Sequence, residues 1–220
     1  MSEPAASRVA TTRAARLRER SAERRAQGKA DLKRQILDAA RTMFATKGYE
    51  GFSLRQVAEE IGYSPTAIYL HFKDKDTLLL TVALEGFRTF GEALQAAYTG
   101  HTGAYARLEA IGAAYLRFGF THPLEYRLMF MQRPEFLEHQ PPEGYEGIED
   151  SFGVLLRTIR EGVASGELEV LSAEEFAAML WALVHGMVSL SLATGSFPVA
   201  DAERLLREHL ESLRRESKGG

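Results

Sequence analysis

Apolar residues recur at spacings of three and four in one segment of this chain after another, and no stretch alternates convincingly as a half-buried strand does. This spacing aligns side chains along one face of an α-helix. The segment 31–47 shows the pattern, and its apolar face consists of Ile36, Leu37, Ala40, Met43 and Phe44. Gly48 follows, where a helix C-terminus belongs. We therefore expect an all-α chain of about nine helices.

The composition is that of an ordinary globular protein, and it excludes several kinds of chemistry. With 220 residues and 45% apolar content, the chain can fill a hydrophobic core. The absence of cysteine rules out a disulfide framework, thiolate catalysis and any cysteine-ligated zinc or iron–sulfur site. The first thirty residues lack the apolar stretch of a secretory signal, so we expect a cytoplasmic protein.

Two short helices are predicted by their first residues. Ser53 followed by Gln56 forms a capping box that opens one helix, and Gly62 closes it. In the stretch G-Y-S-P-T-A-I-Y-L-H-F that follows, Ser64 can cap a helix whose first position is Pro65. The proline therefore starts a helix.

The rest of the chain divides into further helical segments. They cover about 75–98, 108–122, 124–131, 148–166, 173–195 and 201–215, with a long loop rich in proline and glycine at 134–147. We predict three regions: a flexible arm at 1–30, a helical domain at 31–75 and a larger helical domain at 76–220.

Charge is distributed unevenly between these regions. Residues 1–75 hold fifteen Lys and Arg against nine Asp and Glu, whereas residues 76–220 hold twelve against twenty-one. Residues 1–30 carry eight of the basic residues but only Val9 and Leu17 as larger apolar groups, so we expect this arm to be disordered when free. A basic end on an acidic remainder suits a polyanionic partner. A solvated tail without a partner is the alternative.

The pattern so far is three short helices behind a basic arm, with a tight turn between the second and third. This pattern is typical of a helix-turn-helix unit that binds double-stranded DNA. In the third helix Ile68 and Phe72, four residues apart, face inward. Tyr69 and His71 then lie off the buried stripe, on the side where phosphates would run. A half-buried core tyrosine and a surface histidine without a role are the alternatives.

The stretch from residue 48 to 79, G-Y-E-G-F-S-L-R-Q-V-A-E-E-I-G-Y-S-P-T-A-I-Y-L-H-F-K-D-K-D-T-L-L, closely resembles the DNA-binding domain of the TetR family of bacterial transcriptional repressors. The resemblance implies DNA contacts from Ser53, Arg55, Ser64, Pro65, Thr66, Ala67, Tyr69, His71 and Lys75. Thr66 and Ala67 would face bases, Arg55 a base or a phosphate, and the others would contact or border the phosphates and bases. Pro65 and Ala67 depart from common members because they carry no side-chain donor.

The segment 176–195 is long and apolar enough to raise the question of a membrane span. We reject that interpretation because it contains His185, Gly186 and several hydroxyl residues and has no cationic flank. A seam of small residues suggests instead close packing against another helix. With the last helix it would form a four-helix bundle across a two-fold axis, as in TetR-family dimers, through Ala178, Ala182, Gly186, Ser189, Ala193, Leu206, Leu210 and Leu213.

Aromatic residues crowd the middle helices and serve first as core. The family resemblance implies that 31–75 is the DNA-binding domain and that 76–220 is an effector-binding and dimerisation domain with an apolar ligand pocket. The run W-A-L-V-H-G resembles the Trp-His-Gly class of TetR-family C-terminal domains. The candidate pocket residues are Phe87, Phe90, Tyr115, Phe118, Tyr126, Phe130, Trp181 and His185. The histidines show no metal-ligand spacing, so we expect no metal and no cofactor beyond a small-molecule effector that the sequence does not identify.

Together these features predict a homodimeric, sequence-specific transcriptional regulator, a repressor that a small, largely apolar ligand releases from operator DNA. An all-α enzyme is one alternative, but His185 and Glu125 do not form a catalytic constellation, so we expect no enzymatic activity. A DNA-structuring protein without an effector is another.

Overall fold

The computed structural model describes residues 5–131, 151–195 and 198–219. These ranges contain nine α-helices, one short π-helical turn and no strand, which confirms the predicted all-α class. The chain forms two compact units, Met1–Leu78 and Leu79–Gly220, so the division falls three residues beyond the predicted boundary. The predicted loop at 134–147 lies outside the described residues.

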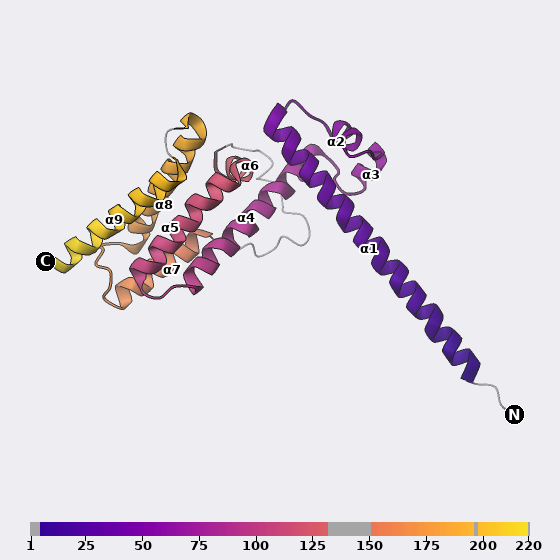
Figure 1. The fold of residues 1–220 in the computed structure, drawn as a ribbon, viewed down its shortest axis with the longest axis horizontal. Coiled ribbons are helices and arrows are strands. Elements are labelled where there is room, and N and C mark those ends of the chain that lie inside the picture. Colours follow the sequence, from indigo (N-terminus) through magenta and orange to yellow (C-terminus); the bar gives the residue numbers. More distant parts are fainter. Residues whose placement is uncertain (1–4, 132–150, 196–197, 220) are drawn as a thin grey trace. The chain divides into compact units, whose positions relative to one another are not determined.

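The first unit is built on α1 (Ala5–Lys47), whose C-terminal part packs against α2 (Leu54–Glu60), which in turn packs on α3 (Pro65–Tyr69) (Figure 1). Its core is the apolar face predicted for segment 31–47, closed by side chains from the two short helices. Ile36, Ala40, Val57, Ala58 and Ile68 are all fully buried. The three helices therefore share one small core.

The segment 5–30 forms a helix continuous with the first predicted helix, so the prediction of a disordered arm is wrong there. Alanine, arginine and glutamate have high helix propensity and need no burial to form a helix. Exposed side-chain pairs support the junction with the packed part, such as Gln27 to Asp31 at 3.1 Å and Arg34 to Asp31 at 2.7 Å. The small number of large apolar residues in this segment therefore did not predict its conformation.

The second unit places α5 (Ala104–Thr121) against three other helices. These are α7 (Ser151–Ala164), α8 (Ala173–Thr194) and α9 (Val199–Gly219). α4 (Lys75–Thr99) begins in the first unit and contributes Phe90 and Leu94 to this core. The predicted helix 124–131 is divided into α6 (Pro123–Tyr126) and the π-helical turn η1 (Arg127–Met131).

Two glycines let neighbouring helices approach α5 closely. A Cβ atom built on Gly112 would lie 2.4 Å from Leu206 Cδ2 on α9, and one on Gly119 would lie 2.5 Å from Val188 Cγ1 on α8. Real Cβ atoms do not approach other atoms so closely, so an added Cβ would force Leu206 or Val188 to move. The Leu206 methyl group is the end of a flexible side chain, whereas Val188 is stiff and β-branched, so position 119 has the stronger need for glycine. α5 is therefore the helix on which this unit is assembled.

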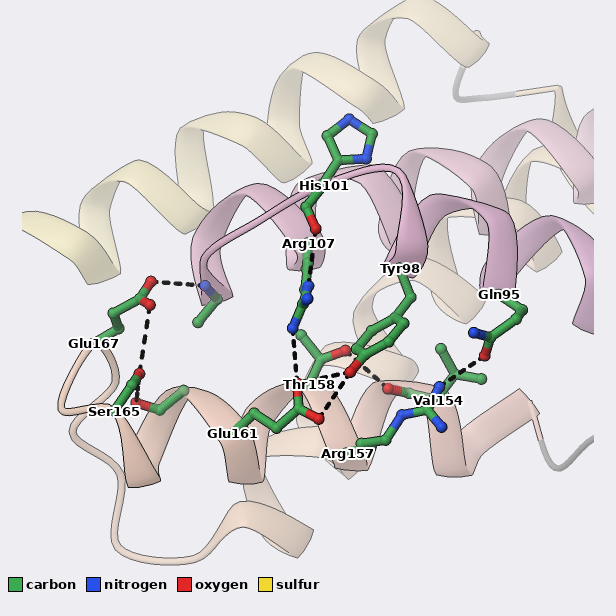
Figure 2. A network of polar contacts seen from close by, with 12 residues as sticks. Gln95, Tyr98, His101, Arg107, Val154, Arg157, Thr158, Glu161, Ser165 and Glu167 are labelled. Carbon is green, nitrogen blue, oxygen red and sulfur yellow. Dashed lines mark hydrogen bonds and ion pairs between the residues drawn. The ribbon is translucent and has the colours of Figure 1, made fainter.

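A polar cluster at the far end of α4 ties it to α5 and α7 (Figure 2). The Tyr98 ring lies between the guanidinium groups of Arg107 and Arg157, 4.2 Å and 4.3 Å from its centre. Glu161 of α7 accepts bonds from the Tyr98 hydroxyl at 2.8 Å and from Arg107 at 2.7 Å. This cluster fixes the end of α4 that lies away from the first unit's core.

Within the described residues, α8 is the one helix long and apolar enough to cross a membrane by length and composition. A single such helix is weak evidence for a span. One face of α8 is buried against its own unit through Ala177, Leu180, Val184 and Val188. A buried core helix meets the same criteria, although only 28% of the most apolar 18-residue stretch of α8 is buried within the described residues.

Replacing Gly119 with alanine tests the close packing of α5 on α8. Gly119→Ala should lower the free energy of unfolding by about 1–3 kcal/mol, because stiff, β-branched Val188 cannot move aside easily. In the double variant Gly119→Ala/Val188→Ala the two losses should be less than additive, since the clashing methyl groups are gone. Chemical denaturation of all four proteins measures the coupling, and strictly additive losses would contradict this packing.

Candidate nucleic-acid interface and ligand cavity

The turn between α2 and α3 forms as its residues predict. Gly62 adopts a φ of 72°, a left-handed conformation that favours glycine. Ser64 then caps α3 by accepting a bond from the Ala67 backbone N–H at 3.3 Å, and Pro65 occupies the first helical turn. This places the start of α3 at the protein surface, with Ser64, Pro65 and Thr66 exposed.

Two buried side chains fix the rotation of α3. Ile68 has no exposed surface and Phe72 has 2%. Tyr69 consequently projects outward with 51% of its surface exposed, and Ala67 is half-buried. The predicted helical phase therefore separates the buried aromatic residue from the outward one as the structure does. The alternative of a half-buried core tyrosine at position 69 does not agree with the observed exposure.

α2 presents its predicted residues on the same unit. Ser53 accepts a bond from the Gln56 backbone N–H at 3.4 Å and is the N-cap of α2, as its capping box predicts. Arg55 is exposed in the first turn, while Leu54 and Val57 are buried. The exposed front of α2 and the exposed start of α3 are therefore both available to a partner.

Lys75 has an intramolecular partner that sequence reasoning missed. Its ammonium donates to the backbone carbonyl of Tyr49 at 2.7 Å and lies 3.8 Å from the centre of the Tyr49 ring. The Tyr49 hydroxyl in turn bonds to Asp76, in the first turn of α4. Lys75 thus holds the turn after α1 to the start of α4. An ammonium has three donors, so this bond leaves it capacity for a phosphate.

His71 is half-buried below the surface that carries Tyr69. Burial lowers the pKa of the imidazole, and the positive charges of Lys29 and Lys33 on α1 lower it further. The ring is therefore neutral at pH 7 in the free protein. The spacing of four residues between Lys29 and Lys33 puts both lysines on one face of α1.

The second unit contains a partly open cavity of about 580 Å³, called here the ligand cavity. Five predicted pocket residues line it: Phe87, Phe90, Tyr115, Phe130 and Trp181. Its further lining residues are Leu94, Leu108, Ile111, Gly112, Ser151, Phe152, Leu155, Ala178, Leu180, Val184, Leu206 and Leu210. The cavity is of a size that suits a small molecule.

The other three predicted pocket residues lie behind its wall. Phe118 packs on Phe90 with ring centres 4.9 Å apart. Tyr126 and His185 form a buried polar cluster with Tyr115: the two tyrosine hydroxyls are 2.9 Å apart, and Nδ1 of His185 lies 2.7 Å from the Tyr126 hydroxyl. These residues support the wall rather than form it.

Burial sets the protonation of this cluster. It raises the pKa of Tyr115 to about 12 and raises that of Tyr126 as well, where the neighbouring Tyr115 contributes. Burial lowers the pKa of His185. All three groups are neutral at pH 7, so Nδ1 of His185 can accept a hydroxyl hydrogen.

Two of the predicted interface residues on the last helix are buried within the protomer, and the dimer interface itself stays a prediction. Leu206 and Leu210 are 3% and 4% exposed in a single chain, line the ligand cavity and pack towards α5, while Leu213 packs on the same core. A helix with one apolar stripe must bury that stripe in its own unit before it can offer it to a second copy. Ala178 also faces the ligand cavity.

The rest of the small-residue seam lies on an outward face of α8. Ala182 and Gly186 line a shallow groove with Leu190 and, from α9, with Leu205 and His209. Ala193 is exposed, and Ser189 is half-buried and donates to the Gly186 carbonyl. Leu190 and Met179 are about half exposed, at 52% and 49%. This outward apolar face of α8 has no cover within the described protomer.

Both halves of the chain match models of known families. Residues 36–82 match the model described as bacterial regulatory proteins, tetR family, and residues 108–213 match the tetracyclin repressor-like C-terminal domain. Together the matches cover well over half of the chain. They fall on the two units that the structure separates.

Relatives of known role are similar over a shorter stretch. The chain is 40% identical over 62 residues to the HTH-type transcriptional repressor AcnR of Corynebacterium diphtheriae. These 62 residues are 28% of this chain and 33% of that protein. It is 47% identical over 53 residues to the HTH-type transcriptional repressor Rv1474c of Mycobacterium tuberculosis, 24% of this chain and 28% of that one. The chain thus spans a third or less of the length of these relatives.

Solved structures are similar over most of the chain. A protein of unknown function from Rhodococcus sp. RHA1 has a TM-score of 0.68 and 28% identity, over 84% of this chain and 94% of that one. The TetR-family regulator PfmR from Thermus thermophilus has a TM-score of 0.64 and 21% identity, over 82% and 94%. The latter shows a shared fold.

The lowered pKa of His185 predicts a pH-dependent stability. Protonation costs more in the folded than in the unfolded protein, so the free energy of unfolding should fall as pH drops below about 6.5, the ordinary pKa of imidazole. The fall should be shallower in His185→Gln. The control His101→Gln changes an exposed histidine and should keep the wild-type fall. Denaturant titrations from about pH 8 to pH 5 measure this, and identical slopes in all three proteins would contradict it.

Proposed function

Because this chain belongs to the TetR family of bacterial regulatory proteins, we propose that it is a cytoplasmic, homodimeric repressor that a small apolar ligand releases from operator DNA. The observation that carries the proposal is the exposed start of α3, held outward by buried Ile68 and Phe72. AcnR and Rv1474c, the two relatives of known role named above, are transcriptional repressors.

α3 would enter the major groove with Thr66 at its front. The threonine hydroxyl can bond to a base edge and its methyl group can contact thymine, whereas Pro65 and Ala67 offer only apolar contacts. Arg55 on α2 is the remaining candidate for base recognition. With so few side-chain donors, selectivity would depend on Thr66, Arg55 and methyl contacts.

Phosphate contacts would surround this helix. Tyr69 and Ser53 can each donate a hydroxyl hydrogen to a phosphate oxygen. His71 can donate its ring N–H in the same way. His71 is neutral in the free protein, and a phosphate beside it would raise its pKa. Lys75 would contact a phosphate while keeping its bond to Tyr49, so it both positions α4 and contributes charge.

The helical start of α1 changes how the basic arm would act. Its arginines are carried on a helix that continues the packed part of α1, and those at 16, 18, 20, 24 and 25 are exposed. Lys29 and Lys33 lie close enough to His71 to affect its pKa. A basic helix beside α3 would add sequence-independent, salt-dependent affinity for the phosphate backbone.

The outward apolar face of α8 is the surface we propose for the dimer. Met179, Ala182, Gly186 and Leu190 expose apolar groups beside the α8–α9 groove. A second copy related by a two-fold axis would cover the same face on both chains. A ligand that fits only the dimer unable to bind DNA would weaken DNA binding by its difference in affinity for the two states.

Substitutions in α3 separate phosphate contacts from base contacts. Tyr69→Phe should weaken binding to all DNA sequences alike by about threefold to tenfold, the value of one hydrogen bond. Thr66→Ala should instead change the preferred sequence. The test is anisotropy titration against DNA sites selected from a random pool by the wild-type protein.

Tyr63→Phe is the matched control, because Tyr63 has a similar exposure of 43% but belongs to the turn before α3. It should leave affinity and preference unchanged. If Tyr69→Phe shifted the selected sequence, or Thr66→Ala weakened all sequences equally, our assignment of the contacts would be wrong.

Gly186→Arg tests the dimer surface. A Cβ atom added at Gly186 meets nothing within 4 Å in the protomer, so the arginine should leave the fold intact but place charge in the proposed interface. Sedimentation equilibrium should show a monomer, and operator affinity should fall at least about tenfold. Ala164→Arg, at an exposed position on α7, should stay dimeric. A dimeric Gly186→Arg protein would refute this surface.

A further inference from the structure

Leu70 is the most exposed large apolar side chain in the described part of the first unit. It is 77% exposed, more than either Tyr69 or Tyr63. The contacts implied by the family resemblance do not include it. A single exposed leucine is common on protein surfaces, so its place on the helix matters more than its exposure alone.

Helical phase directs Leu70 away from the core. It lies two residues after Ile68 and two residues before Phe72, and both of these side chains are buried. Two residues turn an α-helix by about 200°, so a side chain midway between two buried ones points almost directly outward. The Phe72 backbone N–H donates to the Ile68 carbonyl at 3.0 Å, so the helical turn continues past the end of α3. Leu70 therefore lies at the centre of the face that α3 presents.

Thr66 and Leu70 form one outward stripe. The Leu70 backbone N–H donates to the Thr66 carbonyl at 3.2 Å, which puts the two side chains one turn apart on the same face. Ala67 and Tyr69 lie to either side of this stripe. A helix that enters the major groove with Thr66 at its front thus brings Leu70 to the base edges as well.

The chemistry of leucine restricts what it can meet in the groove. The side chain has no hydrogen-bond donor or acceptor, and the one apolar group that the four bases present in the major groove is the 5-methyl group of thymine. Over the other base edges or a phosphate, a leucine would cover polar atoms without pairing them, which costs free energy. Leu70 therefore favours thymine both by contact and by exclusion of the alternatives.

We propose that Leu70 is a further base-recognition residue, which packs on the 5-methyl group of a thymine in the operator. The contact lies one or two base pairs from the base that Thr66 reads, because four residues advance a helix by about 6 Å and base pairs are about 3.4 Å apart. The inference rests on the proposed function, because it adds a specificity-determining residue to the same surface.

Replacement of single thymines by deoxyuridine tests this contact, because uracil lacks only the 5-methyl group. The DNA is the site selected from a random pool by the wild-type, full-length protein, and affinity is measured by anisotropy. At one thymine position, uracil should weaken wild-type binding by about fourfold, the value of one buried methyl group. In Leu70→Ala, the thymine and uracil sites should bind equally at that position.

Two control variants assign the effect to Leu70. Thr66→Ala should keep the loss at this position, because Thr66 reads a different base. Leu171→Ala changes a fully exposed leucine of the second unit and should behave as the wild type does. Leu70→Ala should keep the wild-type circular dichroism spectrum and Tm, since its side chain buries little surface in the protein.

Two results would overturn the inference: wild-type binding that is indifferent to every change of thymine to uracil, or a loss that persists unchanged in Leu70→Ala. A protein that gave either result and still selected one DNA sequence would leave the proposed function standing. A protein that selected no DNA sequence at all would refute both.

Discussion

The burial of Ile68 and Phe72 is the constraint on which the candidate DNA surface depends. Four residues apart, they fix the rotation of a helix of only five residues, too short to hold its shape alone. Once they are buried, Thr66 and Tyr69 can only point outward. The Ser64 cap and the left-handed Gly62 fix where the helix begins. Function at this surface thus follows from the core beneath it.

In the second unit, packing on α5 determines which faces of α8 and α9 are buried and which stay exposed. Its glycines admit Leu206 and Val188, so α8 and α9 bury one stripe each within the protomer. The ligand cavity lies within the core that these helices share, which explains why its described lining residues are uncharged. The opposite face of α8 keeps its exposed apolar residues. One helix therefore contributes both to the cavity and to the outward face.

The sequence predicts the helical phase because capping residues and apolar spacing involve residues that are close together in the chain. Ser53 and Ser64 cap the helices that their sequences predict. Five of eight pocket residues line the cavity, and the other three lie one layer behind, since spacing along a helix gives a face but not a depth. The apolar stripe of the last helix was predicted as a dimer surface, because a stripe does not show whether its own chain or a second copy covers it. In the structure Leu206 and Leu210 are covered by their own chain. The Lys75–Tyr49 contact could not be foreseen, since the two residues are distant in sequence.

The sequence by itself determined the all-α class, the capped helix starts, the outward residues of α3 and the resemblance to a repressor family, because each depends on residues close together in the chain. Only the tertiary structure decided that Leu206 and Leu210 belong to the protomer's core and that Lys75 is bonded to Tyr49. Those facts depend on which helices meet, and contacts between distant segments are set by packing the whole unit at once.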